Sequence, residues 1–486
     1  MTQADSPVPV VTLKSGVLTA GGIALIVVAA AAPLSLIAGY GPIGFLVGGI
    51  GAPAGFLVAG VVLAMFVVGI LAMTRFVAKP GTFYAYIGEG LGPAAGTAAA
   101  ALAITAYLTI NIGGMGIVSA TTRDLILVST GIDVPWWVLG LIITALIWYV
   151  CRRGIDVGVK VLVLLLVAEV GILVVIAFAV LARTGPAELS FASFEPSNVF
   201  TPGMAAAALV WFGAYFGIES TTIYRAEAKN PARTIPRATV ISLVFLAVFY
   251  CFVAWAIAQA FSVPDLAAAI GENPTALIYI IGDYYLGPWA GLTAQALLVT
   301  SSIASGIAYF NAVSRYGHSM GSDGILPRLA MRVHHKYRSP SFGNVQGLVT
   351  AAFVLIFGLL GLDPYLQLTV WFSSPGTLGL ICLMALASIA VAVFFARPRP
   401  DITTARRVLF SVIAAIAAAL LIGVLVMMIL NIELLTGAGG TLNTIVVLTP
   451  AVVFVAAFIG SLTRRRSRRS VESEPSAQTV EYVEGV

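Results

Sequence analysis

Apolar runs of membrane-crossing length recur along the whole chain and are separated by short polar connections. A helix that crosses a bilayer needs about 20 predominantly apolar residues. The hydrophobic pattern therefore predicts an all-α polytopic chain with twelve membrane-spanning helices. These helices lie roughly at residues 20–50, 53–75, 94–122, 135–151, 158–182, 203–224, 238–262, 287–313, 343–362, 364–396, 408–431 and 443–462.

The composition indicates the same class of protein. Hydrophobic residues make up 59% of the chain and charged residues 10%, with a mean hydropathy of +1.01. Charged residues average about 25% in soluble proteins, so this composition excludes a soluble protein. The net charge of +5 comes from basic residues scattered through the loops, and it indicates no nucleic-acid partner.

The positions of the basic residues predict the orientation of the helices. If Lys14 lies in the cytoplasm, all 26 Lys and Arg residues except Arg123 and Arg183 fall on the inner side. This asymmetry follows the positive-inside rule and predicts that both termini lie in the cytoplasm. Residues 1–19 are then a cytoplasmic N-terminal segment. Residues 463–486 are a tail whose arginines suit anionic membrane lipid and whose acidic end is expected to be disordered.

The first span, 20–50, contains Pro33 near its centre. Proline removes one backbone donor and displaces the carbonyl four residues earlier, so the helix should open between Ala30 and Leu36. A simple proline kink, which is common in membrane helices, is the alternative.

The sixth span, 203–224, carries two signals of a second interruption. Gly213 and Gly217 flank Tyr215 and weaken the helix there. A broken helix within a bilayer is tolerated where its free backbone groups face protein or a water-filled cavity. Glu219 follows at membrane depth, where an ionisable side chain indicates function.

Two interrupted spans that each open a group of five are typical of inverted-repeat transporters. The two repeats would be residues 20–182 and 203–396, followed by two further helices in 408–462. A half-helix N-terminus attracts an anionic group, and unwound carbonyls accept hydrogen bonds from an ammonium group. An α-amino acid carries both of these groups.

The candidate substrate site therefore consists of the two openings and one polar residue of the third span. Asn111 in that span faces the path or else makes a hydrogen bond between helices, and the sequence supports both interpretations equally. The predicted substrate-binding residues are Ala31, Ala32, Pro33, Leu34, Ser35, Asn111, Trp211, Phe212, Tyr215, Phe216 and Gly217.

Glu169 stands alone in the fifth span, with no charged residue for eight positions on either side. A carboxylate at the centre of a membrane helix costs roughly 2.5–3.5 kcal/mol on insertion scales, so it should face the interior of the bundle. Glu169 and Glu219 are the candidates to carry a coupling proton. The alternative for Glu169 is a permanently protonated acid that bonds a neighbouring helix.

Hydroxyls at Ser301, Ser302 and Ser305 cluster in the eighth span and are candidates for a cation site. They could equally bond carbonyls of their own helix. In the tenth span, Phe372 lies in a Pro- and Gly-containing run, 371–376, where we expect a helix irregularity and a gate. The sequence indicates no cofactor and no metal site.

Three stretches of the sequence carry a resemblance to a known family. GTFYAYIGEGLGP (81–93), FGIESTTIYRAEAKNPARTIPRA (216–238) and SRYGHSMGSDGILPRLAMRVHHKYRSPS (314–341) resemble the signature stretches of the amino acid–polyamine–organocation transporter superfamily. The resemblance extends over roughly residues 14–465. It implies a five-plus-five inverted repeat of the LeuT type with broken helices 1 and 6. It also implies secondary transport of amino acids or amines across the plasma membrane.

Two acids can be compared with the superfamily residue by residue. Glu219 resembles a proton sensor of arginine exchangers, and Glu169 falls where some proton-coupled members have a lysine in place of a sodium ion. The charge at that position is reversed here. The usual glycine-serine-glycine opening of the first span is also replaced, by AAAAPLSLIAG.

The sequence thus predicts a proton-coupled amino acid permease that works by alternating access. A polyamine or cationic amino acid transporter or exchanger of the same superfamily is the alternative. We expect no enzyme, because Gly-x-Ser-x-Gly, His-Glu-x-x-His and phosphate-loop patterns are absent from the sequence.

Overall fold

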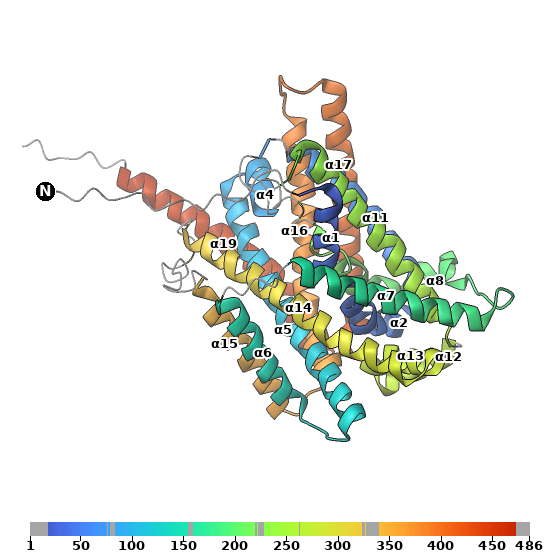
Figure 1. Ribbon diagram of the computed structural model, residues 1–486. Helices are drawn as coiled ribbons and strands as arrows, with labels where there is room; N and C mark the ends of the chain where they lie inside the picture. Colours follow the sequence, from blue (N-terminus) through green and yellow to red (C-terminus); the bar gives the residue numbers. More distant parts are fainter. Residues whose placement is uncertain are drawn as a thin grey trace, which may run out of the picture.

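The computed structural model describes residues 18–74, 76–77, 83–153, 159–218, 221, 228–261, 263–322, 326 and 340–472. Within these ranges the chain is helical and contains no β-strand beyond an isolated bridge between Leu18 and Ala228. Figure 1 shows the helices gathered into one bundle, with α19 (Gly440–Glu472) at its periphery.

Ten helices of the described part are long and apolar enough to cross a membrane. They are η1 to α3 (Ser35–Met73), α5 (Pro93–Thr130), α6 (Trp136–Arg153), α7 (Val159–Thr184), α11 (Pro231–Ala258), α14 (Pro288–Ser322), α15 (Phe342–Leu359), η7 with α16 (Pro364–Ala396), α17 (Thr404–Leu430) and α19. The chain is therefore a multi-pass membrane protein, whereas the count of twelve spans and the inverted repeat stay predictions.

The first predicted span is divided in two. Helix α1 (Ala20–Ala30) ends at a turn, and Ala32 has a positive φ of 45°, which L-residues rarely adopt. The chain then continues through the π-helix η1 (Ser35–Tyr40), α2 (Gly41–Gly48) and η2 (Gly49–Gly51) into α3 (Ala52–Met73). Because Pro33 has no N–H to donate, regular helical bonding stops beside it.

The sixth predicted span is also interrupted. It consists of α9 (Pro202–Ala206), α10 (Ala208–Gly213) and a series of turns up to Ile218. The N–H groups of Tyr215, Phe216 and Ile218 each donate to the carbonyl three residues earlier, and Gly217 has a φ of 107°. Glu219 lies outside the described residues.

Several short helices lie in the connections between the long ones. They are α4 (Phe83–Leu91), η3 (Ala192–Phe194), α8 (Pro196–Val199), α12 (Val263–Glu272), η5 (Pro274–Ala276), α13 (Leu277–Leu286) and α18 (Ile432–Thr436). Of these, α12, η5 and α13 link α11 to α14 at one end of the bundle (Figure 1).

The irregularity that we expected at 371–376 lies one turn earlier, as the π-helix η7 (Pro364–Thr369). Asp363 caps its start by accepting from the N–H groups of Tyr365 and Leu366. Residues 371–376 are α-helical, and Gly376 is there for packing, since a Cβ at this position would lie 2.6 Å from Ile110 Cγ1 of α5. The expected irregularity at 371–376 was wrong, because Gly376 allows α16 to pack closely on α5 and does not interrupt the helix.

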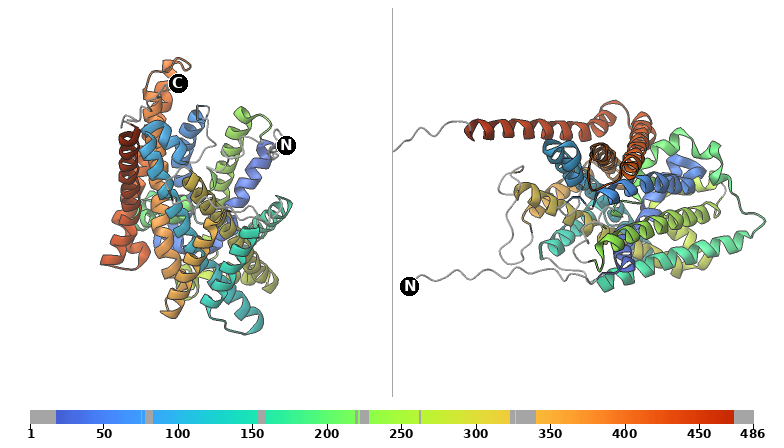
Figure 2. Two further views of the ribbon diagram at one scale, coloured as in Figure 1. Left: turned by 90° about the vertical axis from the view of Figure 1, so that its left-hand side faces the viewer. Right: turned by 90° about the horizontal axis from the view of Figure 1, so that it is seen from above.

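Helix α5 is central to the bundle and packs against α14, α16 and α19. It begins with Pro93 in its first turn and ends at Gly131 in the left-handed conformation, the usual start and stop signals of a helix. Figure 2 shows the bundle from two further sides.

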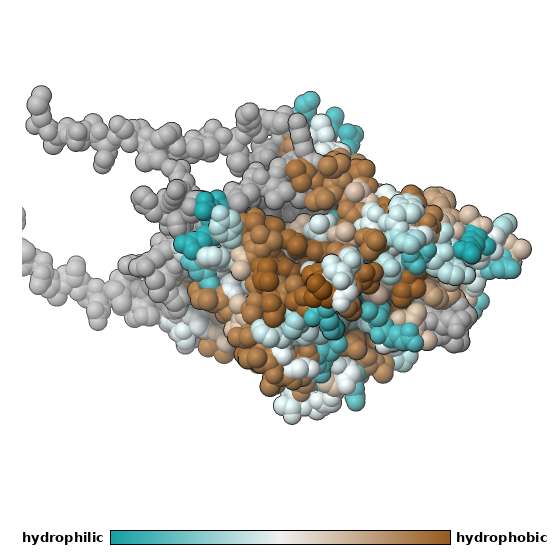
Figure 3. All heavy atoms as spheres, turned by 60° about the horizontal axis from the view of Figure 1, so that its bottom comes forward, coloured by the Kyte–Doolittle hydropathy of each residue, from teal (hydrophilic) through white to brown (hydrophobic). Residues whose placement is uncertain are grey.

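Large apolar side chains remain exposed on the outside of the bundle. On α7, for example, Leu164 is 69% exposed, and on α17 Leu430 is 73% exposed. Figure 3 shows such residues covering much of one face in brown. A surface of this kind is expected where lipid chains replace water as the surrounding medium.

Candidate functional site

A cavity of about 60 Å³ lies at the interruption of the first span. One water needs about 10–15 Å³ of such volume, so the cavity has room for a small solute. Its lining comes from the α1–η1 junction, α5, α10 with the following turns, α14 and α16. These lining residues are Ala31, Ala32, Ser35, Leu36, Tyr40, Ile110, Asn111, Gly114, Met115, Ile117, Leu209, Gly213, Phe216, Ser302, Ser305, Gly306, Tyr309, Ser373 and Thr377.

Two side-chain contacts join distant helices across this central cavity. The Ser35 and Ser302 hydroxyls are 3.0 Å apart, and the Tyr40 and Ser373 hydroxyls are 3.4 Å apart. The first pair links the start of η1 to α14, and the second links the end of η1 to α16. The segment after the interruption is therefore held from both sides.

Asn111 both lines the cavity and makes a bond between helices. Its Nδ2 donates to the Gly306 carbonyl at 3.1 Å, and the residue is 2% exposed. The two interpretations that the sequence left open are thus not exclusive. The bond fixes the amide at the point where α5 faces α14.

None of the described residues that line the central cavity is acidic or basic. Its polar groups are hydroxyls, one amide and the backbone of the interruption. The Ala31 carbonyl, for instance, is 3.5 Å from the Tyr250 hydroxyl. Such a lining binds a charged ligand through backbone dipoles and helix ends, and it provides no counter-ion for a charged side chain.

Glu169 lies behind this lining, on α7. It is 5% exposed, and its carboxylate faces the Leu34 N–H and the Ser301 hydroxyl beside the interruption. Ser301 is fully buried, yet its Oγ makes no well-formed hydrogen bond within the part of the chain that the structure describes. The acid therefore lies beside the backbone of the break and α14, and it is not among the described residues that line the central cavity.

The aromatic residues predicted at the second opening point in different directions. Phe216 lines the central cavity, whereas Trp211 packs on Gly44 and Gly55 and donates its Nε1–H to the Met204 carbonyl at 3.1 Å. Phe212 is buried in the core, and Gly217 is half-buried in the turns that follow α10. Phe372 packs on two phenylalanines of α15, at 4.6 Å from the ring centroid of Phe353 and 5.7 Å from that of Phe357.

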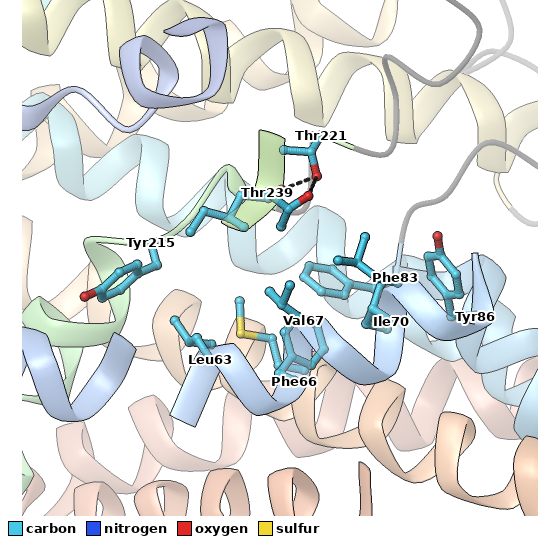
Figure 4. A pocket seen from close by; sticks show the side chains of 12 residues that line it. Leu63, Phe66, Val67, Ile70, Phe83, Tyr86, Tyr215, Thr221 and Thr239 are labelled. Carbon is cyan, nitrogen blue, oxygen red and sulfur yellow. Dashed lines mark hydrogen bonds between the residues drawn. The ribbon is translucent and has the colours of Figure 1, made fainter. Parts of the chain in front are cut away.

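Tyr215 lies at a second, smaller cavity of about 30 Å³ (Figure 4). Its hydroxyl donates to the Phe56 carbonyl at 2.5 Å. The rest of the lining is apolar apart from Tyr86 and the Thr221–Thr239 pair, whose hydroxyls are 2.9 Å apart. With no charged group and few free polar atoms, this cavity offers little that would recognise a zwitterion.

The structure thus brings seven predicted site residues into one lining: Ala31, Ala32, Ser35, Asn111, Phe216, Ser302 and Ser305. Pro33, Leu34, Trp211, Phe212, Tyr215, Gly217, Ser301 and Phe372 lie outside it. Sequence reasoning missed Tyr40, Tyr309, Ser373 and Thr377. Ser373 was within a flagged run, but nothing in the sequence singled out the other three.

The sequence model of the amino acid permease family matches residues 22–474 of this chain. The branched-chain amino acid permease BcaP of Bacillus subtilis (strain 168) is 24% identical over 285 residues, which cover 56% of this chain and 54% of that protein. An uncharacterized transporter of Mycobacterium tuberculosis (strain ATCC 25618 / H37Rv) is 28% identical over 198 residues, covering 40% and 42%. Cationic amino acid transporter 5 of Arabidopsis thaliana is 27% identical over 216 residues, covering 44% and 34%. The matched stretches span about half or less of these relatives.

Proposed function

The chain belongs to the amino acid permease family of the amino acid–polyamine–organocation superfamily, and from this premise we propose that it is a proton-coupled transporter of neutral amino acids. The observation that carries the proposal is the uncharged cavity at two interrupted helices. We further propose that it works by alternating access in the cell membrane, with both termini in the cytoplasm.

The two interruptions supply the groups that a zwitterion needs. The second half of the first span begins at Pro33, and its start is the positive end of a helix dipole, where a carboxylate is favoured. The loosened turns after α10 leave carbonyl groups for the ammonium. The backbone groups at the two interruptions would thus bind the α-carboxylate and α-ammonium groups that all amino acids share.

The rest of the lining favours an uncharged, aliphatic side chain. Leu36, Ile110, Ile117 and Leu209 face the space, and none of the described lining residues is an acid that could pair with a second cation. Unpaired charge is costly in such surroundings. The name of the Bacillus relative, a branched-chain amino acid permease, supports the same substrate class.

A cationic amino acid or polyamine transporter is the second candidate. Similarity to a plant cationic amino acid transporter favours it, and Glu169 is an acid close to the cavity. Competition for leucine uptake by other neutral amino acids, arginine and putrescine separates the two candidates. Inhibition by arginine or putrescine alone would favour the second.

Glu169 is our candidate to carry the coupling proton. It is buried beside the backbone of the interruption, so its charge state changes the electrostatic environment of the segment that the substrate binds. We expect Glu169→Gln to abolish leucine accumulation driven by a pH gradient in proteoliposomes while leucine exchange continues. Glu169 loses this role if the variant accumulates leucine with unchanged pH dependence.

A further inference from the structure

A third cavity, of about 70 Å³, lies at one end of the bundle. It is formed where the last turns of α5, the η5–α13 segment and the first turns of α14 meet, at the lower right of Figure 1. No residue lines both this cavity and the central one. We call it the end cavity, and it is independent of the proposed transport function.

Asp124 of α5 places a carboxylate in the end cavity. The Thr275 hydroxyl donates to it, and none of the lining residues that the structure describes is basic. The neighbouring Arg123 is held by Asp133 through two bonds of 2.6 and 2.7 Å, so its charge is already balanced. The negative charge of Asp124 therefore has no side-chain cation of its own in this cavity.

Gln295 of α14 adds an unpaired acceptor to the same lining. The residue is 3% exposed, and its Nε2 reaches the Thr121 carbonyl at 3.5 Å. Its Oε1 has no hydrogen-bond partner in the described part of the chain. Because a buried oxygen without a donor is destabilising, the arrangement calls for a ligand that donates hydrogen bonds.

The remaining lining restricts the chemistry of that ligand. Tyr279 provides an aromatic ring, and Leu125, Val128 and Leu292 provide aliphatic surface. A divalent cation such as Ca²⁺ prefers six or more oxygen ligands, often several of them carboxylates, and the end cavity has one carboxylate. An ammonium group instead donates three hydrogen bonds and is attracted by an aromatic face.

We propose that the end cavity is a binding site for a small primary ammonium ion. The ammonium donates to Asp124 and to Gln295 Oε1, and the short alkyl chain lies against the aliphatic side chains. Since Asp124 belongs to α5 and Gln295 to α14, the bound ion bridges two long helices and the η5–α13 segment between them. Occupancy therefore stabilises this end of the bundle.

Calorimetric titration of the full-length protein in lipid nanodiscs with ethylammonium chloride tests the proposal. We expect one saturable site for ethylammonium and no such binding of potassium chloride at the same concentration. Asp124→Asn removes the charge at constant shape, and Gln295→Leu removes the acceptor at similar volume. Each should weaken binding by roughly tenfold or more, because a charge-assisted bond is lost.

Two control variants separate the end cavity from other acids and from the central cavity. Glu272→Gln removes an exposed carboxylate of α12 that does not line the end cavity, and it should bind ethylammonium as before. Gly213→Leu, which fills the central cavity, should also leave this binding unchanged. If Asp124→Asn unfolds, the Gln295→Leu result decides.

Four outcomes would overturn the proposal. They are no saturable binding, equal binding of potassium, full affinity in the Asp124 and Gln295 variants, or loss of binding in Gly213→Leu. The last would show that the ion occupies the central cavity.

Discussion

Filling the central cavity at Gly213 should weaken substrate binding without damaging the fold. Gly213 lines the cavity, and no atom of the described residues lies within 4 Å of the position that its Cβ would take. It is the last residue of α10 and has no positive φ, so alanine is tolerated there and is favoured by about 0.5–1 kcal/mol where the backbone is helical. A side chain at this position enters empty space.

The size of the effect follows from the volume that the substrate loses. Each CH₂ group excluded from an apolar site costs about 0.8 kcal/mol, so Gly213→Ala should raise the Kd for leucine by roughly fourfold. Gly213→Leu adds four carbons to a cavity of about 60 Å³. If the four added carbons exclude an equal part of the substrate, binding should lose about 3 kcal/mol, which is roughly a 100-fold rise in Kd.

Calorimetric titration of purified protein in nanodiscs with leucine measures this Kd, and thermal unfolding of the same samples checks the fold. Gly423→Leu is the matched control, because Gly423 is exposed on α17 and its Cβ would also meet no atom of the described residues within 4 Å. It should leave both quantities unchanged. If Gly213→Leu stays folded and binds leucine as tightly as the unmodified protein, the substrate site lies elsewhere.

Three further predictions concern contacts around the site and at the surface. Ser302→Ala leaves the buried Ser35 hydroxyl without its 3.0 Å partner and should lower the free energy of unfolding by about 1–3 kcal/mol. Denaturant titration measures this change, and an unchanged midpoint would contradict it. Gly44→Ala places a Cβ 2.5 Å from the Trp211 ring, and the Tm should fall because overpacking costs about 1–3 kcal/mol, whereas Gly423→Ala should not lower it. The arginine partner of Asp133 lowers the pKa of that carboxyl below its ordinary value of 3.8, so the pair stabilises the fold above about pH 4, and this contribution is lost as the pH falls through the lowered pKa. Asp133→Asn should remove that part of the acid dependence of Tm, and an identical pH profile would refute it.

Local chemistry allowed the interruptions to be located from sequence. Pro33 lacks an N–H, and Gly217 adopts a φ of 107°, so in both places the helix departs from regular bonding beside the residue that predicted it. Long apolar runs likewise predicted the membrane helices, because length and hydropathy are properties of the run itself. The family assignment followed from motifs that the family match confirmed.

The lining of the site depended on contacts that sequence spacing does not contain. Ser35 meets Ser302 across 267 positions, and nothing local shows that these two hydroxyls face each other. Trp211 stands one turn from Phe216, yet it fits against the glycines of α2 and α3 and leaves the cavity to Phe216. The direction in which each side chain points depends on the local backbone of the irregular segment. The 3.6-residue period of a regular helix does not predict this direction where the helix is interrupted.

A cryo-electron microscopy map of the full-length protein with saturating leucine tests the central claim most directly. We expect ligand density in the central cavity, with the carboxylate at the backbone that follows Ala32 and the aliphatic chain beside Ile110 and Gly213. Leucine density at any other place, with the central cavity unoccupied, would contradict it.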